Sequence, residues 1–201
     1  MAKTSGAEVV DLPGTPRSPA ASGTKNSPRP GWMSDAWLTA LTERAGIGAD
    51  RLDRGPTYAD RSRLADVVIE PGSVSALVRQ SRRLSYDAEV TVRPLSEEQW
   101  ERVVAVLAGN TAMMAAAVEG DLDPALLEML SEEGLEMLPR KGDVKAHCNC
   151  PDDAKVCKHA AGLMHLMADE LRQDPLVLFS LRGLLAGTDG AGHIEEPPTV
   201  E

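Results

Sequence analysis

The sequence has few cysteines, few aromatic residues and no long apolar run. The first and last of these exclude classes of protein, and the second limits what can build the core. Three cysteines in 201 residues are an odd and small number, which argues against a secreted framework held by disulfides. No apolar run approaches the ~18 residues that a membrane span needs, and no N-terminal stretch resembles a signal peptide. We therefore expect a protein of the reducing cytoplasm. Because aromatic residues make up only 3% of the chain, Ala, Leu, Val and Met must build its core.

The chain divides by composition into a folded middle and two polar ends. Residues 1–30 are rich in Pro, Ser, Gly and Thr and lack apolar periodicity, so they cannot bury enough surface to offset the entropy of ordering, and we expect disorder. The same prediction holds for residues 187–201. Between them we expect an α+β region with acidic helices at 31–138, a cysteine-containing unit at 139–173 and a C-terminal helix at 174–186.

The apolar pattern predicts helices around a small sheet. Three β-branched runs with close turns, at 64–70, 73–80 and 85–95, predict a three-stranded antiparallel meander. A helix is predicted at 34–45, capped by Ser34 and ended by Gly46, with Trp32 and Trp37 as packing anchors. Further helical segments are predicted at 49–62, at 97–107 behind a capping box at residues 96–99, at 112–119, at 124–133 and after residue 159. The predicted fold class is α+β.

Charge is distributed unevenly along the chain. The net charge is −10, and residues 94–138 hold ten acidic residues against Arg102 alone, a net of −9. Residues 51–93 and 139–160 each carry a net charge of +2. An acidic protein repels DNA at long range, whereas local basic faces can still contact phosphate. The acidic helices at 97–133 are either a solvated face or a docking face for a basic partner.

All three cysteines lie within ten residues, in the stretch HCNCPDDAKVCKH. The pattern is Cys148-x-Cys150, six residues, and Cys157-x-His159. Three thiolates and one imidazole are a donor set that suits tetrahedral zinc. In an extended strand, residues i and i+2 point to the same side, so Cys148 and Cys150 can face one ion. We expect Cys157 just before the following helix and His159 in its first turn, where the helix N-terminus lies near the site.

Four protein ligands would close the coordination sphere, which predicts a structural zinc ion and not a catalytic one. The alternatives are three idle buried cysteines or a reversible disulfide switch. The remaining histidines are weaker candidates. His147 points to the strand face opposite Cys148, His165 lies about 240° around the helix from His159, and His193 falls in the polar C-terminal end.

A Cys-x-Cys and Cys-x-His motif followed by an Ala-rich amphipathic helix resembles the SWIM-type zinc finger. The wider layout over 31–183 is similar to bacterial SWIM proteins found beside Swi/Snf-type helicases, with the segment RGPTYADRSRLADVVIEPGSVSALVRQS before the finger and DPLVLFSLRG after it. The resemblance implies that Cys148, Cys150, Cys157 and His159 bind one zinc ion. It also implies a role in binding DNA or proteins, often during DNA processing. One departure is Asp152-Asp153, where the family usually has an aromatic residue after Cys-Pro.

No nucleophile elbow, phosphate loop or pair of catalytic carboxylates stands out, so we expect a protein that is not an enzyme. The first functional hypothesis is an adaptor that docks a Swi/Snf-type helicase or another DNA-processing protein, a role that the acidity of the chain favours. The alternative is direct DNA binding, which would make the protein nucleoid-associated, through the finger and a set of basic residues: Arg79, Arg82, Arg83, Lys155 and Lys158. A thiol redox sensor is a third possibility.

Overall fold

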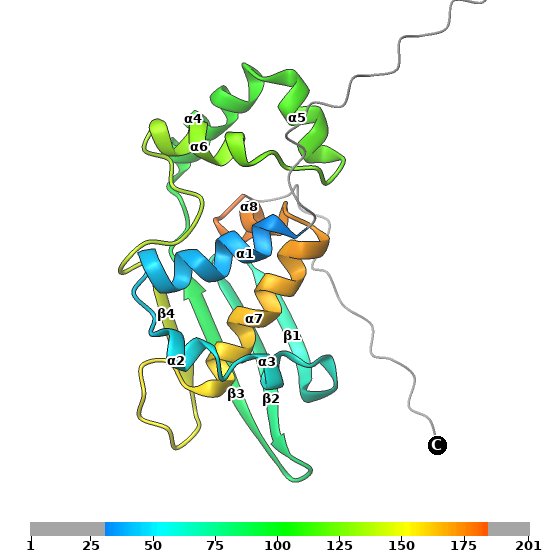
Figure 1. Cartoon of the computed structure of the whole chain (residues 1–201), viewed down its shortest axis with the longest axis vertical. Coiled ribbons are helices and arrows are strands. Elements are labelled where there is room, and N and C mark those ends of the chain that lie inside the picture. Colours follow the sequence, from blue (N-terminus) through cyan, green and yellow to red (C-terminus); the bar gives the residue numbers. More distant parts are fainter. Residues whose placement is uncertain (1–30, 185–201) are drawn as a thin grey trace, which may run out of the picture.

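The computed structural model describes residues 31–184. The predicted disordered ends at 1–30 and 187–201, and His193, lie outside the described residues. The described chain is α+β, as predicted. An antiparallel sheet is covered on one face by helices, and a group of three further helices stands at one end of the molecule (Figure 1).

Three strands of the sheet form the predicted meander. β1 (Leu64–Glu70), β2 (Ser73–Ser81) and β3 (Leu84–Val92) are consecutive antiparallel neighbours. A fourth strand, β4 (Val144–Cys148), pairs antiparallel with β3, and the order is β1-β2-β3-β4. The prediction of a three-stranded sheet is therefore wrong by one strand. The stretch before the cysteines was expected to be extended, but its pairing with β3 is a long-range contact that local pattern does not reveal.

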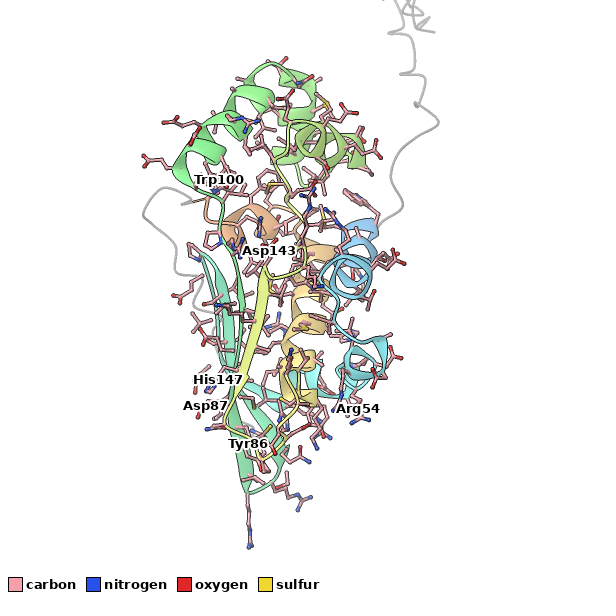
Figure 2. All side chains as sticks on the ribbon, turned by 90° about the vertical axis from the view of Figure 1, so that its left-hand side faces the viewer. Arg54, Tyr86, Asp87, Trp100, Asp143 and His147 are labelled. Carbon is pink, nitrogen blue, oxygen red and sulfur yellow. The ribbon has the colours of Figure 1, made fainter. Side chains whose placement is uncertain are left out.

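Strand alternation gives the sheet two different faces. Val74, Ala76 and Val78 of β2 point to the same face as Ala88 and Val90 of β3, and all five are buried. Figure 2 shows the helices on this side of the sheet, whereas the labelled side chains of residues 87 and 147 project from the other side. No helix of residues 31–184 covers that second face.

The central helix is α7 (Lys158–Gln173), which packs against β2, β3 and β4. Ten of its residues are buried, including Leu163, Leu166 and Leu171, so the predicted amphipathic helix is confirmed. α1 (Trp32–Thr39) and its π-helical continuation η1 (Ala40–Arg44) cross α7 (Figure 1). Trp37 is fully buried there, and its indole N–H donates to the carbonyl of Met164 at 2.9 Å.

The prediction that Ser34 caps the first helix is wrong, whereas the prediction that Gly46 ends it is correct. α1 starts after Gly31, whose φ is +84°, and Ser34 lies inside the helix. The Ser34 hydroxyl is buried and accepts a hydrogen bond from Arg172 Nη2 at 3.1 Å. The Ser34 hydroxyl is thus engaged by Arg172 of α7 and does not cap α1. Gly46 has a φ of +77° and follows the π-helical segment, as expected of a helix-ending glycine.

Two glycines allow the next segment to lie against α7. The segment contains α2 (Ala49–Leu52), α3 (Pro56–Ala59) and the 3-10 turn η2 (Arg61–Arg63). A Cβ atom on Gly162 would lie 2.7 Å from the Cβ of Tyr58, and one on Gly55 would lie 2.5 Å from the carbonyl oxygen of Ala161. Only residues without side chains permit this approach, which holds Tyr58 beside the first turns of α7.

The three helices at the end of the molecule lie between β3 and β4 in the sequence. They are α4 (Glu97–Ala108), α5 (Thr111–Val118) and α6 (Pro124–Glu132), which agree with the predicted helices. Ser96 and Gln99 form both hydrogen bonds of the predicted capping box, and Asp123 caps α6 by accepting from the Ala125 N–H at 2.9 Å. No single helix in residues 31–184 is long and apolar enough to cross a membrane; α4 and α5 reach that standard only when joined across a 105° bend.

The short C-terminal helix α8 (Val177–Leu181) connects this helical group to the sheet. The indole N–H of Trp100, on α4, donates to the carbonyl of Arg182 at 3.1 Å. Arg182 is itself buried, and its Nη2 donates to the carbonyl of Glu136 at 2.8 Å. Burial lowers the pKa of Arg182. These contacts fix the helical group at the end of the sheet near α8.

Candidate metal centre

The structure brings Cys148, Cys150, Cys157 and His159 into one cluster. Their four ligand atoms all lie within 4.8 Å of one another. The Nδ1 atom of His159 is 3.7 Å from the sulfur of Cys148 and 3.9 Å from that of Cys157. Ligands ~2.0–2.3 Å from a tetrahedral zinc ion lie roughly 3.4–3.8 Å apart. The cluster can therefore hold a metal ion, and its donors and spacing fit zinc.

The first two cysteines face the cluster because the chain stays paired with β3 beyond the end of β4. Cys148 is the last residue of β4, and the N–H of Asn149 donates to the carbonyl of Asp87 at 3.2 Å. The Asn149 side chain also pairs with this residue, accepting from its N–H at 3.0 Å and donating to its carboxylate at 2.7 Å. This pairing keeps the Cys-x-Cys segment extended, so that Cys148 and Cys150 lie on the same side.

The other two ligands are placed by the start of α7. Cys157 is the N-cap residue, and its sulfur accepts a hydrogen bond from the N–H of Ala160 at 3.4 Å. His159 follows in the first turn and is only 1% exposed. The positive end of the helix dipole therefore lies at the cluster, where it favours thiolate charge. Both positions agree with the sequence-based prediction.

The imidazole of His159 is oriented by contacts on its far side. Its Nε2 lies 2.8 Å from Oε1 of Gln80, which also accepts a hydrogen bond from the Tyr58 hydroxyl at 3.2 Å. Because that oxygen is an acceptor only, Nε2 must carry the proton, and the lone pair of Nδ1 then faces the sulfurs. The rings of Tyr58 and Tyr86 lie 5.0 and 4.9 Å from the imidazole, centroid to centroid. These contacts set both the tautomer and the plane of the ring.

Burial sets the protonation of the cluster. It raises the pKa of the Cys148 thiol to about 12 and also raises the pKa of Cys157. Burial, assisted by the charge of Lys158, lowers the pKa of His159. The lowered pKa favours the neutral imidazole that a metal ligand requires, and a bound cation would have to displace protons from the Cys148 and Cys157 thiols.

The other histidines in the described chain lie away from the cluster. His147 is exposed on the uncovered face of the sheet, where it lines a shallow pocket with Asp87 and Glu89 (Figure 2). Strand alternation separates it from Cys148, as predicted. His165 is part-buried, and its Nε2 lies 3.0 Å from the carbonyl of Leu52. It helps to attach α2 to α7.

The basic residues proposed for nucleic-acid contact lie in four places at the end of the molecule that holds the cluster. Arg82 and Arg83 are exposed at the turn between β2 and β3, and Lys155 is exposed in the loop between the ligand pairs. Arg79 is exposed on β2 and donates to the carbonyl of Ser62 at 3.2 Å. Lys158 lies over the ring of Tyr58, 5.3 Å from its centroid. Within residues 31–184, none of the five forms an ion pair with an acidic side chain.

Sequence reasoning missed four residues at this end of the molecule. Gln80 and the two tyrosines, Tyr58 and Tyr86, surround His159. Arg63 lies over the ring of Tyr58 at 5.6 Å from its centroid, beside Lys158. Tyr58, Arg63 and Gln80 lie in the segment at 54–81 that resembles bacterial SWIM proteins, and Tyr86 lies in the predicted meander, but neither pattern indicated that they would surround His159. The loop residues Asp152 and Asp153 are exposed, and Asp152 accepts a turn hydrogen bond from the N–H of Ala154 at 3.1 Å.

The chain is similar to the uncharacterized protein Rv2102 of Mycobacterium tuberculosis. The two sequences are 30% identical over 153 residues, which cover 76% of this chain and 54% of Rv2102. The chain thus spans about half the length of this relative. No family model matches the sequence. No solved structure matches it either.

Proposed function

We propose that this protein is a zinc-binding interaction module of the SWIM type that acts as a non-catalytic adaptor for a DNA-processing partner, a Swi/Snf-type helicase by resemblance. The observation that supports it is the cluster of Cys148, Cys150, Cys157 and His159, which supplies four protein ligands. A zinc ion with four protein ligands has no open position for substrate. Its role here would be to join the end of β4 to the start of α7. Reduced thiols are needed for this, which fits a cytoplasmic location.

Metal content tests the first part of the proposal. Elemental analysis of the purified 201-residue chain should give one zinc per chain. The Cys157→Ser and His159→Ala variants should lose it, whereas the matched control His147→Ala should keep it, because His147 points away from the cluster. Equal zinc in the wild type and the Cys157→Ser variant would refute the proposed ligand set.

Removal of the metal tests its structural role. A strong chelator should lower the thermal midpoint measured by circular dichroism and expose residues 140–173 to hydrogen exchange, because metal binding is coupled to folding in such units. A melting curve that the chelator leaves unchanged would contradict this role. Thiol counting separates the redox-sensor alternative, since thiolates bound to metal resist mild alkylation.

Direct DNA binding is a second candidate, and one arrangement favours it. Positive charge gathers at the same end of the molecule as the metal cluster. It comes from the exposed arginines of the β2–β3 turn, from Arg79 on β2, and from Arg63 and Lys158 over the ring of Tyr58. Basic side chains beside an aromatic ring are a common surface for phosphate and bases. The acidic helical group lies at the other end (Figure 1).

Binding of the zinc-loaded protein to labelled single- and double-stranded DNA across a salt series separates the two candidates. Direct binding predicts an affinity that falls steeply with salt and is weakened by Arg82→Ala/Arg83→Ala. The control Arg102→Ala, on α4, should have no such effect. If no binding occurs even at low salt, the DNA candidate is refuted. The adaptor candidate then requires that the metal-loaded protein bind a helicase partner.

A further inference from the structure

The helix α5 has an apolar sequence, TAMMAAAV, but lies mostly at the surface. A helix that is apolar on all sides is ordinarily buried. Here only Ala117 is buried, whereas Val118 is 72% and Met114 is 40% exposed. Because residues four apart lie one above the other on a helix, Met114 and Val118 form one outward stripe with Ala115 beside it. On the neighbouring α4, Val104 is 50% exposed.

This apolar stripe lies within the most acidic part of the protein. Nine exposed acidic residues belong to α4, α5, α6 and their connections: Glu97, Glu98, Glu101, Glu119, Asp121, Asp123, Glu128, Glu132 and Glu133. The only basic side chain among residues 94–138 is Arg102, which donates to the carbonyl of Glu133 and pairs with its carboxylate at 3.7 Å. The surface therefore combines exposed methionine and valine with a large net negative charge.

We infer that the surface formed by α4, α5 and α6 binds a basic amphipathic helix of a partner protein. The apolar side of such a helix would cover Met114, Ala115 and Val118, and its lysines or arginines would face the surrounding carboxylates. Methionine suits this contact because its flexible, polarizable side chain adapts to the ridges of a bound helix. This inference names the partner class of the proposed adaptor and so rests on that proposal.

Charge favours this occupant over two others. An anionic membrane would be repelled by the nine carboxylates, which carry the same sign as its lipids. A second copy of this chain would bring the same acidic surface against itself, and like charges across an interface are costly. A basic amphipathic helix would neutralise the carboxylates with one side and cover the apolar stripe with the other.

The test uses the zinc-loaded 201-residue chain and a fluorescent peptide of leucine and lysine, about 16 residues long, with leucines at i, i+3, i+4 and i+7. A second peptide has the same composition in an order that destroys the amphipathic pattern. We expect saturable binding of the first peptide at one per chain, with helix formation on binding. The double variant Met114→Gln/Val118→Gln should weaken it about tenfold, since two apolar contacts of ~0.7 kcal/mol each are lost.

The matched control is Val68→Gln, because Val68 is 47% exposed on β1, outside the helical group. It should leave the affinity unchanged, and circular dichroism should show that all variants are folded. Equal affinity for both peptides, or no effect of the double variant, would overturn the inference. Binding to phosphatidylcholine vesicles, or self-association in sedimentation, that the double variant abolishes would overturn it in favour of a membrane or a second copy.

The outcome can be separated from that of the proposed function. The stripe lies on α5, at the other end of the molecule from the cluster between the end of β4 and the start of α7 (Figure 1). A protein without zinc would refute the metal module, yet peptide binding could still be measured on it. A protein with zinc but no peptide binding would refute only the docking surface.

Discussion

Replacing Gln80 by leucine should weaken zinc binding without removing any ligand. Gln80 lies on β2, and its Oε1 is 2.8 Å from Nε2 of His159 and 3.2 Å from the Tyr58 hydroxyl. Leucine has nearly the same volume but cannot accept a hydrogen bond. The Nε2–H of a histidine that is 1% exposed would lose its partner, and the imidazole would no longer be held with Nδ1 toward the sulfurs.

The size of the effect follows from this geometry. Outer partners of metal-binding histidines typically contribute 10–100-fold in metal affinity, which corresponds to about 1.4–2.7 kcal/mol. The loss of one buried hydrogen bond with a stranded donor, about 1–3 kcal/mol, gives the same range. Glutamate at position 80 would keep an acceptor at this place, so Gln80→Glu should bind zinc at least as tightly as the wild type.

Competition with a chromophoric chelator at fixed pH measures the zinc affinity of each variant. Gln173→Leu is the matched control, because Gln173 is exposed at the far end of α7. The reasoning would be refuted if Gln80→Leu and Gln173→Leu bound zinc equally tightly, or if Gln80→Glu lost as much affinity as Gln80→Leu.

Three further predictions concern the fold. Trp37→Ala should cost about 3–5 kcal/mol in urea unfolding, because it empties a fully buried site and removes an indole hydrogen bond; a loss below 1 kcal/mol would contradict this packing. Gly162→Ala should destabilise the protein in the same assay, because the new methyl group would lie 2.7 Å from Cβ of Tyr58. Such overpacking typically costs ~1–3 kcal/mol, which outweighs the ~1 kcal/mol that alanine gains over glycine in helix propensity. A more stable Gly162→Ala variant would show that Tyr58 can move away. The hydrogen bond from the N–H of Ser62 lowers the pKa of Asp60, so the ionised carboxylate stabilises the fold at neutral pH, and this stabilisation is lost as the pH falls through the folded-state pKa. Asp60→Asn should therefore lose less stability than the wild type between about pH 5 and pH 2. Identical acid-unfolding curves for the two proteins would argue against this contribution.

The local sequence pattern was sufficient to predict most of the helices and strands. The three strands of the meander and the capping box at Ser96 were found where alternation and cap chemistry predicted them. The two errors both involve partners that are distant in sequence. β4 joins the sheet through β3, and Ser34 is satisfied by Arg172 of α7. A local pattern specifies which face of a segment is buried, but not which distant segment covers it.

At the candidate site, too, the local motif could be predicted and the contacts from distant segments could not. The clustering of Cys148, Cys150, Cys157 and His159 could be predicted because all four lie within one short motif, whose spacing suits one strand end and one helix start. Gln80 could not be predicted, because it lies 79 residues before His159 in the sequence and a lone glutamine is not part of any metal-binding motif. The exposure of α5 was also unpredicted, since its composition is that of a core helix.

The helical group enters and leaves the sheet at a single point. Val92 of β3 is paired directly with Val144 of β4, and the N–H of Arg93 donates to the carbonyl of Asp143 at 2.8 Å. Residues 93–143 therefore form an insertion between two strands whose ends already meet. The segment is exchangeable in principle: a short hairpin turn could replace it and leave β3, β4 and the metal ligands connected, while the contacts of Trp100 with the end of α8 would be lost. The surface of the helical group and the metal cluster are therefore built from separate stretches of the chain, and either could be altered without changing the other's residues.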